Sequence, residues 1–139
     1  MERELDHVGR IMEQWRRERP DVDPSPMGVI GRLHRLAEAL HGELRPVFAE
    51  AGLSDGDFDV LASLRRSGAP YQLTPGELAA STMVTSGAVT KRLDRLEEKG
   101  FVTRTVCVDD ARSRQIRLTD LERSRLAHLL EAWGRTLDV

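Results

Sequence analysis

The segment 74–119 constrains the fold more than any other part of the chain, because signals for two helices, a turn and two strands follow one another there. Thr74, Pro75 and Glu77 form the pattern of a capping box with proline at the first helical position. A helix is therefore expected to begin at this point and to end near Ser81.

A second short helix is expected after a turn at residues 82–84, where Thr85 or Ser86 can cap its first turn. Its apolar positions recur at helical spacing and predict a buried stripe: Val89, Leu93 and Leu96. Gly100 follows directly, in the position that glycine favours just beyond the C-terminal end of a helix.

Two strand-like runs complete the segment, at residues 101–106 and 115–118, both rich in β-branched or alternating residues. The polar tip predicted between them holds Asp109, Asp110, Arg112 and Arg114. Helix, turn, helix and hairpin in this order predict a winged helix-turn-helix, which places one helix in the major groove of DNA and a loop beside it. The predicted fold is therefore mostly α with a small β-hairpin wing (α+β).

The outward face of the second helix carries residue types that suit DNA. Small and hydroxylated side chains let the helix approach base edges, and cations contact phosphates or guanine. Arginine on the wing suits the narrow minor groove. The predicted DNA-binding residues are Thr85, Ser86, Gly87, Thr90, Lys91, Arg95, Arg112 and Arg114. The alternative is that these are ordinary solvated charges.

The charge distribution supports the same interpretation. Residues 1–83 carry ten arginines against fourteen acidic residues, a net charge of −4. Residues 84–117 carry eight basic residues against five acidic ones, a net charge of +3. Because local charge matters more than the total for binding a polyanion, DNA is expected to contact the second segment.

Several short segments along residues 33–119 match the pattern of one known family. They are Gly52-Leu53-Ser54, Phe58, Val60-Leu61, Leu78-Ala79, Gly87, Val89-Thr90, Leu93-Asp94-Arg95-Leu96-Glu97 and Gly100-Phe101-Val102, with Asp110, Arg112, Leu118 and Thr119 in the wing. Through this set the chain resembles the MarR family of bacterial transcriptional regulators. The resemblance implies a homodimer that binds a pseudo-palindromic operator in double-stranded DNA.

Apolar residues at helical spacing predict further helices at 4–19, 28–51, 54–66 and 121–137. Pro46 is expected to kink or end the second of these near Arg45. The apolar faces exceed what a winged helix can bury, which favours a symmetric dimer. We expect a helical dimerisation region at 1–51 and 120–139 and a winged helix-turn-helix at 52–119, within a single compact domain.

The chain departs from the family pattern after the wing. Members usually place a long dimerisation helix and then a final helix after the Leu-Thr of the wing, whereas only one helix follows Thr119. Either the chain is naturally short, or the sequence joins two segments across a gap. A break between Leu118 and Arg125 would indicate the second.

The N-terminal extension resembles the urate-responsive branch of the family, which has a leading helix with a tryptophan and a proline-punctuated linker. The resemblance implies an effector site formed by Trp15, Asp59, Arg92 and Arg104. A flat anion would stack on the indole and pair with both guanidinium groups. The alternatives are packing for Trp15, a structural Asp59–Arg92 pair, and a DNA-facing Arg104. Another aromatic acid or a tricarboxylate could replace urate.

Other classes of function have little support in the sequence. The four histidines lack metal-ligand spacing, catalytic motifs are missing, and no cofactor is expected. A single cysteine and the lack of a long apolar run favour a cytoplasmic protein without a membrane span. The predicted function is a dimeric DNA-binding regulator, a repressor released by a small anionic effector. The alternative is a winged helix that docks proteins without reading bases.

Overall fold

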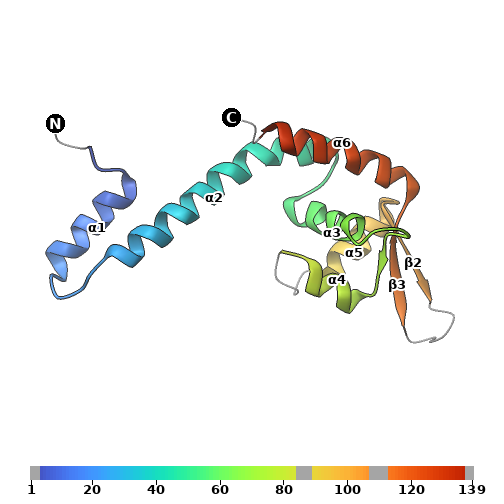
Figure 1. Ribbon diagram of the computed structural model, residues 1–139, viewed down its shortest axis with the longest axis horizontal. Coiled ribbons are helices and arrows are strands. Elements are labelled where there is room, and N and C mark those ends of the chain that lie inside the picture. The colour runs from blue at the N-terminus through green and yellow to red at the C-terminus, as the bar shows by residue number, and fades with distance from the viewer. Residues whose placement is uncertain (1–3, 84–88, 107–112, 137–139) are drawn as a thin grey trace. The chain divides into compact units, whose positions relative to one another are not determined.

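A computed structural model describes residues 4–83, 89–106 and 113–136. The helices are α1 (His7–Glu18), α2 (Ser25–Glu50), α3 (Asp55–Arg66), α4 (Pro75–Ser81), α5 (Val89–Glu98) and α6 (Asp120–Thr136), and the strands are β1 (Gln72–Leu73), β2 (Val102–Val106) and β3 (Arg114–Leu118) (Figure 1). The chain divides into two compact units, residues 1–43 and 44–139, and α2 runs through the boundary. The assignment of particular segments to dimerisation stays a prediction.

The N-terminal unit is a helical hairpin whose helices are joined through Asp6. One carboxylate oxygen of Asp6 accepts a hydrogen bond from the Gly9 N–H at 2.7 Å and caps α1. Both oxygens also accept from Arg32 on α2, at 2.9 and 3.0 Å. The Arg32 hydrogen bonds, with help from Gly9, lower the pKa of Asp6 to about 2. Gly28 allows close contact, because a Cβ there would collide with the sulfur of Met12.

The helix expected over 28–51 is observed as α2, and of the two effects expected from Pro46 the ending near Arg45 is wrong, since the helix continues through Pro46 to Glu50. Proline removes one backbone donor from a helix, but here the following turn is held by tertiary packing. Leu44 and Phe48 are buried in the core of the second unit. The helix then ends in a Schellman motif at Gly52, whose φ is +71°, with the Leu53 N–H donating to the Phe48 carbonyl at 2.9 Å.

The predicted helix-turn-helix is confirmed over the residues that the structure describes. Thr74 and Glu77 form both bonds of the capping box, and α4 ends at Ser81. Val89, Leu93 and Leu96 are buried along α5. Gly100 closes α5 with φ of +76°, and the Phe101 N–H donates to the Leu96 carbonyl at 2.9 Å. The predicted caps of α5, Thr85 and Ser86, lie outside the described residues.

The sheet has three antiparallel strands in the order β1-β3-β2. The hairpin of β2 and β3 is confirmed, with Val102 opposite Leu118 and Val106 opposite Arg114. Arg114 therefore belongs to β3 rather than to the hairpin tip. The sequence did not predict β1, because two residues are too short to show alternation. Its two residues pair with Arg117 and Ile116 of β3.

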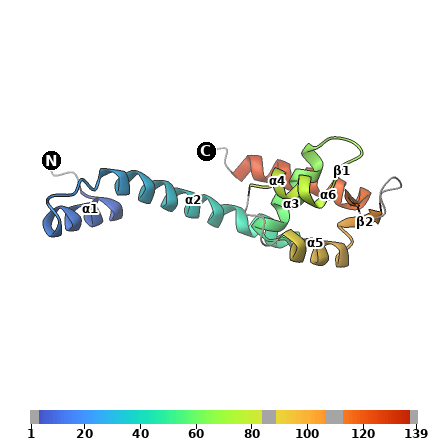
Figure 2. The same cartoon turned by 90° about the horizontal axis from the view of Figure 1, so that it is seen from below.

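The core of the second unit lies where α2, α3, α5, α6 and the sheet meet. Its fully buried side chains include Val60, Leu61, Leu64, Leu78, Leu96, Ile116 and Leu126. In both ribbon views α6 lies beside the C-terminal end of α2 (Figures 1 and 2). The backbone is continuous from β3 through Thr119 into α6, so there is no break between Leu118 and Arg125.

Candidate nucleic-acid interface

The helix α5 presents two distinct faces. Its apolar stripe is buried, whereas Thr90 and Lys91 are exposed at its N-terminal end. Arg114 is also exposed, at the start of β3. The other predicted contacts in the turn and the wing lie outside the described residues: Thr85, Ser86, Gly87 and Arg112. An exposed hydroxyl and ammonium group on a helix held by its opposite face can approach DNA without unfolding the core.

Arg95, predicted to contact DNA, is paired within the protein. Its Nη2 lies 2.6 Å from Oδ1 of Asp57, which is buried in the first turn of α3. About half of the Arg95 side chain remains exposed (49%). Burial tends to raise the pKa of Asp57, but hydrogen bonds from Ser54 and Arg95 outweigh it, so this pKa lies below its ordinary value.

Arg92 lies against the same turn of α3. A Cβ built on Gly56 would overlap the guanidinium group of Arg92, so only glycine leaves room for it there. Arg92 is half-buried as a result. Positions 92 and 95 are three residues apart and share one face of α5. The guanidinium groups of Arg92 and Arg95 therefore both contact the first turn of α3.

Arg104 on β2 faces the acidic side of α5. Its Nη1 lies 2.7 Å from Asp94 and its Nε lies 3.3 Å from Glu97. The side chain is largely covered, with 22% exposed. Arg104 thus joins the strand of the wing to the helix that precedes it.

Asp59 and Trp15 complete the set of predicted effector residues. The carboxylate of Asp59 accepts a hydrogen bond from the Met83 N–H at 2.9 Å, so it fixes the backbone just after the end of α4. Trp15 belongs to α1 in the N-terminal unit, where its side chain is 43% exposed. Arg92 is part of α5, and Arg104 forms ion pairs with α5. Asp59 bonds to Met83, which precedes α5 in the chain.

Two cations that sequence reasoning missed bind the end of α2. Lys99 donates to the Gly52 carbonyl at 2.6 Å, and Arg125 donates to the Ala51 carbonyl at 2.9 Å. The negative end of a helix dipole favours cations at this position. Arg125 also stacks on the Phe101 ring, 4.6 Å from its centroid. Neither contact could be predicted from the sequence, because the partners are 47 and 74 positions apart.

Glu122 is the one fully buried acidic side chain among the described residues. Arg125 Nη1 lies 3.2 Å from its Oε2, yet neither carboxylate oxygen has a hydrogen-bond partner within residues 4–83, 89–106 and 113–136. Burial raises its pKa above the ordinary value, and the charge of Arg125 offsets part of that effect. This burial could not be predicted from the sequence, because helical spacing indicates only which apolar positions share a buried face.

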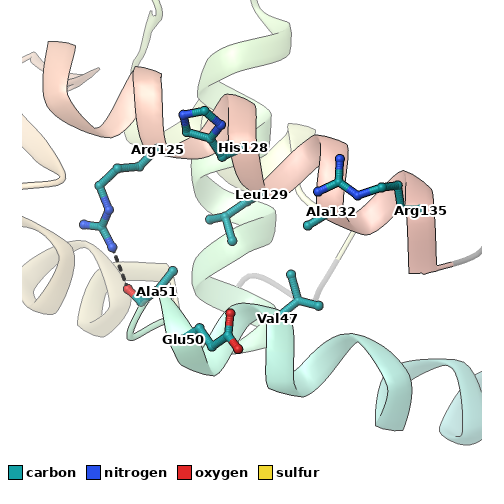
Figure 3. Close-up of a pocket in the computed structure, with 8 residues that line it drawn as sticks. All are labelled: Val47, Glu50, Ala51, Arg125, His128, Leu129, Ala132 and Arg135. Carbon is teal, nitrogen blue, oxygen red and sulfur yellow. Dashed lines mark hydrogen bonds between the residues drawn. The ribbon is translucent and has the colours of Figure 1, made fainter.

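A pocket of about 390 Å³ opens between the end of α2 and α6 (Figure 3). Val47 and Leu129 form apolar walls, and Arg125 reaches past the pocket to the Ala51 carbonyl. The remaining lining residues mix charge and small size: Glu50, His128, Ala132 and Arg135. The pocket lies next to the Arg125 contact with the end of α2.

Metal and membrane sites find no support in the described part of the chain. No group of three or more His, Cys, Asp or Glu side chains is arranged there to hold a metal ion. No helix within the described ranges is both long and apolar enough to cross a membrane.

The comparisons with known proteins agree with this geometry. A model of the MarR family matches residues 51–113. The chain is 45% identical over 113 residues to the HTH-type transcriptional regulator PecS of Dickeya dadantii, covering 81% of this chain and 68% of PecS. It is 31% identical over 110 residues to the HTH-type transcriptional repressor YetL of Bacillus subtilis, covering 79% of this chain and 65% of YetL.

A solved structure shares the fold at low sequence identity. The Bordetella bronchiseptica protein BpsR, whose DNA binding is described as regulated by 6-hydroxynicotinic acid, superposes with a TM-score of 0.70 at 17% identity. The match covers 79% of this chain and 76% of that one. Together with the identity to PecS over two thirds of its length, the winged helix-turn-helix shows that this chain belongs to the MarR family of transcriptional regulators, which bind DNA and are not enzymes.

Proposed function

We propose that the protein is a homodimeric, sequence-specific repressor that acts in the cytoplasm and leaves its operator when a small anionic effector binds. The main observation in support of DNA recognition is that α5 has two faces: its apolar stripe is buried, and Thr90 and Lys91 are exposed. Thr90 would approach base edges, and Lys91 would contact a phosphate or guanine. The other proposed DNA contacts are Thr85, Ser86, Gly87, Arg112 and Arg114. Arg95 also contributes to DNA binding, through its pair with Asp57.

A dimer is supported by the apolar face of α2 in the N-terminal unit. Ile30 and Leu33 are 69% and 62% exposed, and Val29 and Leu36 are also open to solvent. A contiguous apolar face of this kind marks a protein interface. Two-fold symmetry would present two α5 helices to a pseudo-palindromic operator, at centres about 34 Å apart. The name of YetL as a repressor supports the proposed sign of regulation.

The proposed effector is urate or another aromatic or carboxylic acid. Trp15 enters this proposal from the family resemblance alone. The contacts of the other three residues support a release mechanism. An anion that draws Arg104 away would leave Asp94 and Glu97 without their cation. An anion that repels Asp59 would release the Met83 N–H before α5. Both changes favour a displaced α5, and BpsR offers a precedent for regulation by a heteroaromatic acid.

The test is DNA binding by the complete chain over a series of salt concentrations. A duplex that the protein enriches from a random-sequence pool serves as the probe. Lys91→Gln should weaken binding and lower the salt slope by about 1, because one phosphate contact is lost. Arg17→Gln removes the same charge from α1, a helix that carries none of the proposed DNA contacts, and should leave the slope unchanged.

The effector is tested by adding urate or 6-hydroxynicotinic acid to the bound complex. Release by either compound, abolished in Arg104→Gln, supports the effector site. Release that persists in this variant would contradict the assigned residues. If the protein enriches no duplex, DNA reading itself is wrong, and the docking of a partner protein becomes the better proposal.

A further inference from the structure

Asp57 has more contacts than its place in a helix cap requires. Its Oδ2 accepts from the Ser54 N–H at 3.0 Å, and its own N–H donates to the Ser54 hydroxyl at 3.2 Å, which completes the capping box of α3. Its Oδ1 accepts from Arg95 of α5 at 2.6 Å. One buried carboxylate thus fixes the start of α3 and, at the same time, a residue 38 positions later.

The short Asp57–Arg95 contact directs the guanidinium group of Arg95 into the protein, whereas an arginine that binds a DNA phosphate must direct it outward. A charge-assisted hydrogen bond to a buried carboxylate is strong and directional. If Arg95 turned to DNA, the buried carboxylate would lose its cation, which is costly in a site that excludes water. Arg95 is therefore better suited to hold α5 than to read the duplex.

Arg92 adds a second contact between α5 and the first turn of α3. Its guanidinium group occupies the space over Gly56, directly before Asp57. The two arginines share one face of α5, and both meet the first turn of α3. Contacts at two successive points on one face restrict both the rotation of α5 about its axis and its shift along that axis. That rotation decides which way Thr90 and Lys91 point.

We propose that Asp57 is a positioning residue for DNA reading. It sets the rotation of α5 through Arg95, and Arg95 contributes to operator affinity through this pair rather than through a phosphate contact. The inference rests on the proposed reading of DNA by α5. It adds a specificity-determining residue on α3, a helix that carries none of the proposed DNA contacts.

The experiment compares Asp57→Asn, Arg95→Gln and the double variant on the duplex that the unaltered protein enriches from a random pool. Asparagine keeps an oxygen for the Ser54 N–H but lacks the charge that Arg95 needs. Each single variant should lower affinity about tenfold, and the double variant no further, as expected for residues coupled in one ion pair. The salt slope should stay that of the unaltered protein in all three.

A phosphate contact by Arg95 would give a different pattern. Arg95→Gln would then lower the salt slope by about 1, Asp57→Asn would leave affinity unchanged or raise it, and the two effects would add. That pattern would overturn the inference while leaving DNA reading intact. Failure of the unaltered protein to enrich any duplex would instead contradict the proposed function.

A matched variant distinguishes a loss of positioning from a general loss of stability. Ser54→Ala removes the hydroxyl that caps α3 but keeps the backbone N–H that Oδ2 of Asp57 accepts, and it leaves Oδ1 paired with Arg95. It should lower thermal stability, as loss of a cap does, while operator affinity of the folded protein is kept. If Ser54→Ala lowers affinity as much as Asp57→Asn, the effect is general destabilisation, and the positioning role is wrong.

Discussion

Arg104 on β2 lies between two carboxylates of α5, 2.7 Å from Asp94 and 3.3 Å from Glu97. Asp94 and Glu97 are three residues apart and therefore present both charges on one side of the helix. The contact joins the wing to the helix whose exposed face carries Thr90 and Lys91. Any movement of the strand is therefore transmitted to α5 through a side chain that is mostly covered.

Replacing Arg104 with glutamine should lower the free energy of unfolding by about 1 kcal/mol, since two partly exposed ion pairs are lost together. Thermal and urea unfolding measure this change. Arg135→Gln is the control, because its pair with Glu131 spans 4.0 Å and both side chains are mostly exposed. Equal losses in the two variants would show that burial of Arg104 adds nothing.

Gly100→Ala should destabilise the protein by about 1 kcal/mol, because the left-handed conformation at φ of +76° strains any residue with a Cβ. Apart from the adjacent residues, no described atom lies within 4 Å of the added carbon, so strain is the expected effect. Gly42→Ala makes the same chemical change inside α2, also in open space, and should stabilise by about 0.5–1 kcal/mol. Denaturant unfolding of both variants tests the opposite signs.

The sequence predicted the elements whose signals are local. The capping box at Thr74 and the glycine at 100 fix their helix ends through neighbouring residues, so both were confirmed. The sequence left open whether the helix continues through Pro46, because this continuation depends on the burial of Leu44 and Phe48 against distant segments. The same limit applies to β1, which exists only through its pairing with β3.

The candidate site shows the same division between local and distant information. The faces of α5 followed from its periodicity, and Thr90 and Lys91 lie on the exposed side as expected. The partners of Arg95 and Arg104 did not follow, because Asp57 is far away in the sequence and the β2–α5 contact depends on tertiary packing. Charge type alone could not distinguish a cation for DNA from one held by a carboxylate.

Glu122→Gln should stabilise the protein near neutral pH by about 1 kcal/mol, because it removes a buried charge whose desolvation the charge of Arg125 offsets only in part. Burial raises the pKa of Glu122 above its ordinary value of 4.5, so the folded chain binds this proton more tightly than the unfolded chain. The stability from this group is present below pH 4.5 and is lost as the pH rises through the folded pKa. The stability advantage of glutamine should therefore shrink as the pH falls through the folded pKa of Glu122, and it should be smallest below pH 4.5.

Urea unfolding at several pH values measures this difference. Glu131→Gln, an exposed change on the same helix, is the control and should show little effect at any pH. An advantage of Glu122→Gln that is constant with pH would mean that the carboxyl does not titrate differently in the folded protein. A loss of stability near neutral pH would mean that the pair with Arg125 contributes more than burial costs.

Replacing Leu33 and Leu36 together with glutamine should convert the proposed dimer into a monomer. Both side chains are exposed on α2, and glutamine keeps the helix propensity close to that of leucine, so the helix itself should persist. Each leucine buried at an interface contributes about 1.5–3 kcal/mol, and the double change removes two from each protomer. Sedimentation velocity over a range of concentrations measures the shift, with circular dichroism to confirm helix content.

Val106→Gln removes an equally exposed apolar residue from β2 and should leave the dimer intact. A dimer that survives the double change in α2 would place the interface elsewhere, and equal dissociation by Val106→Gln would place it on the wing.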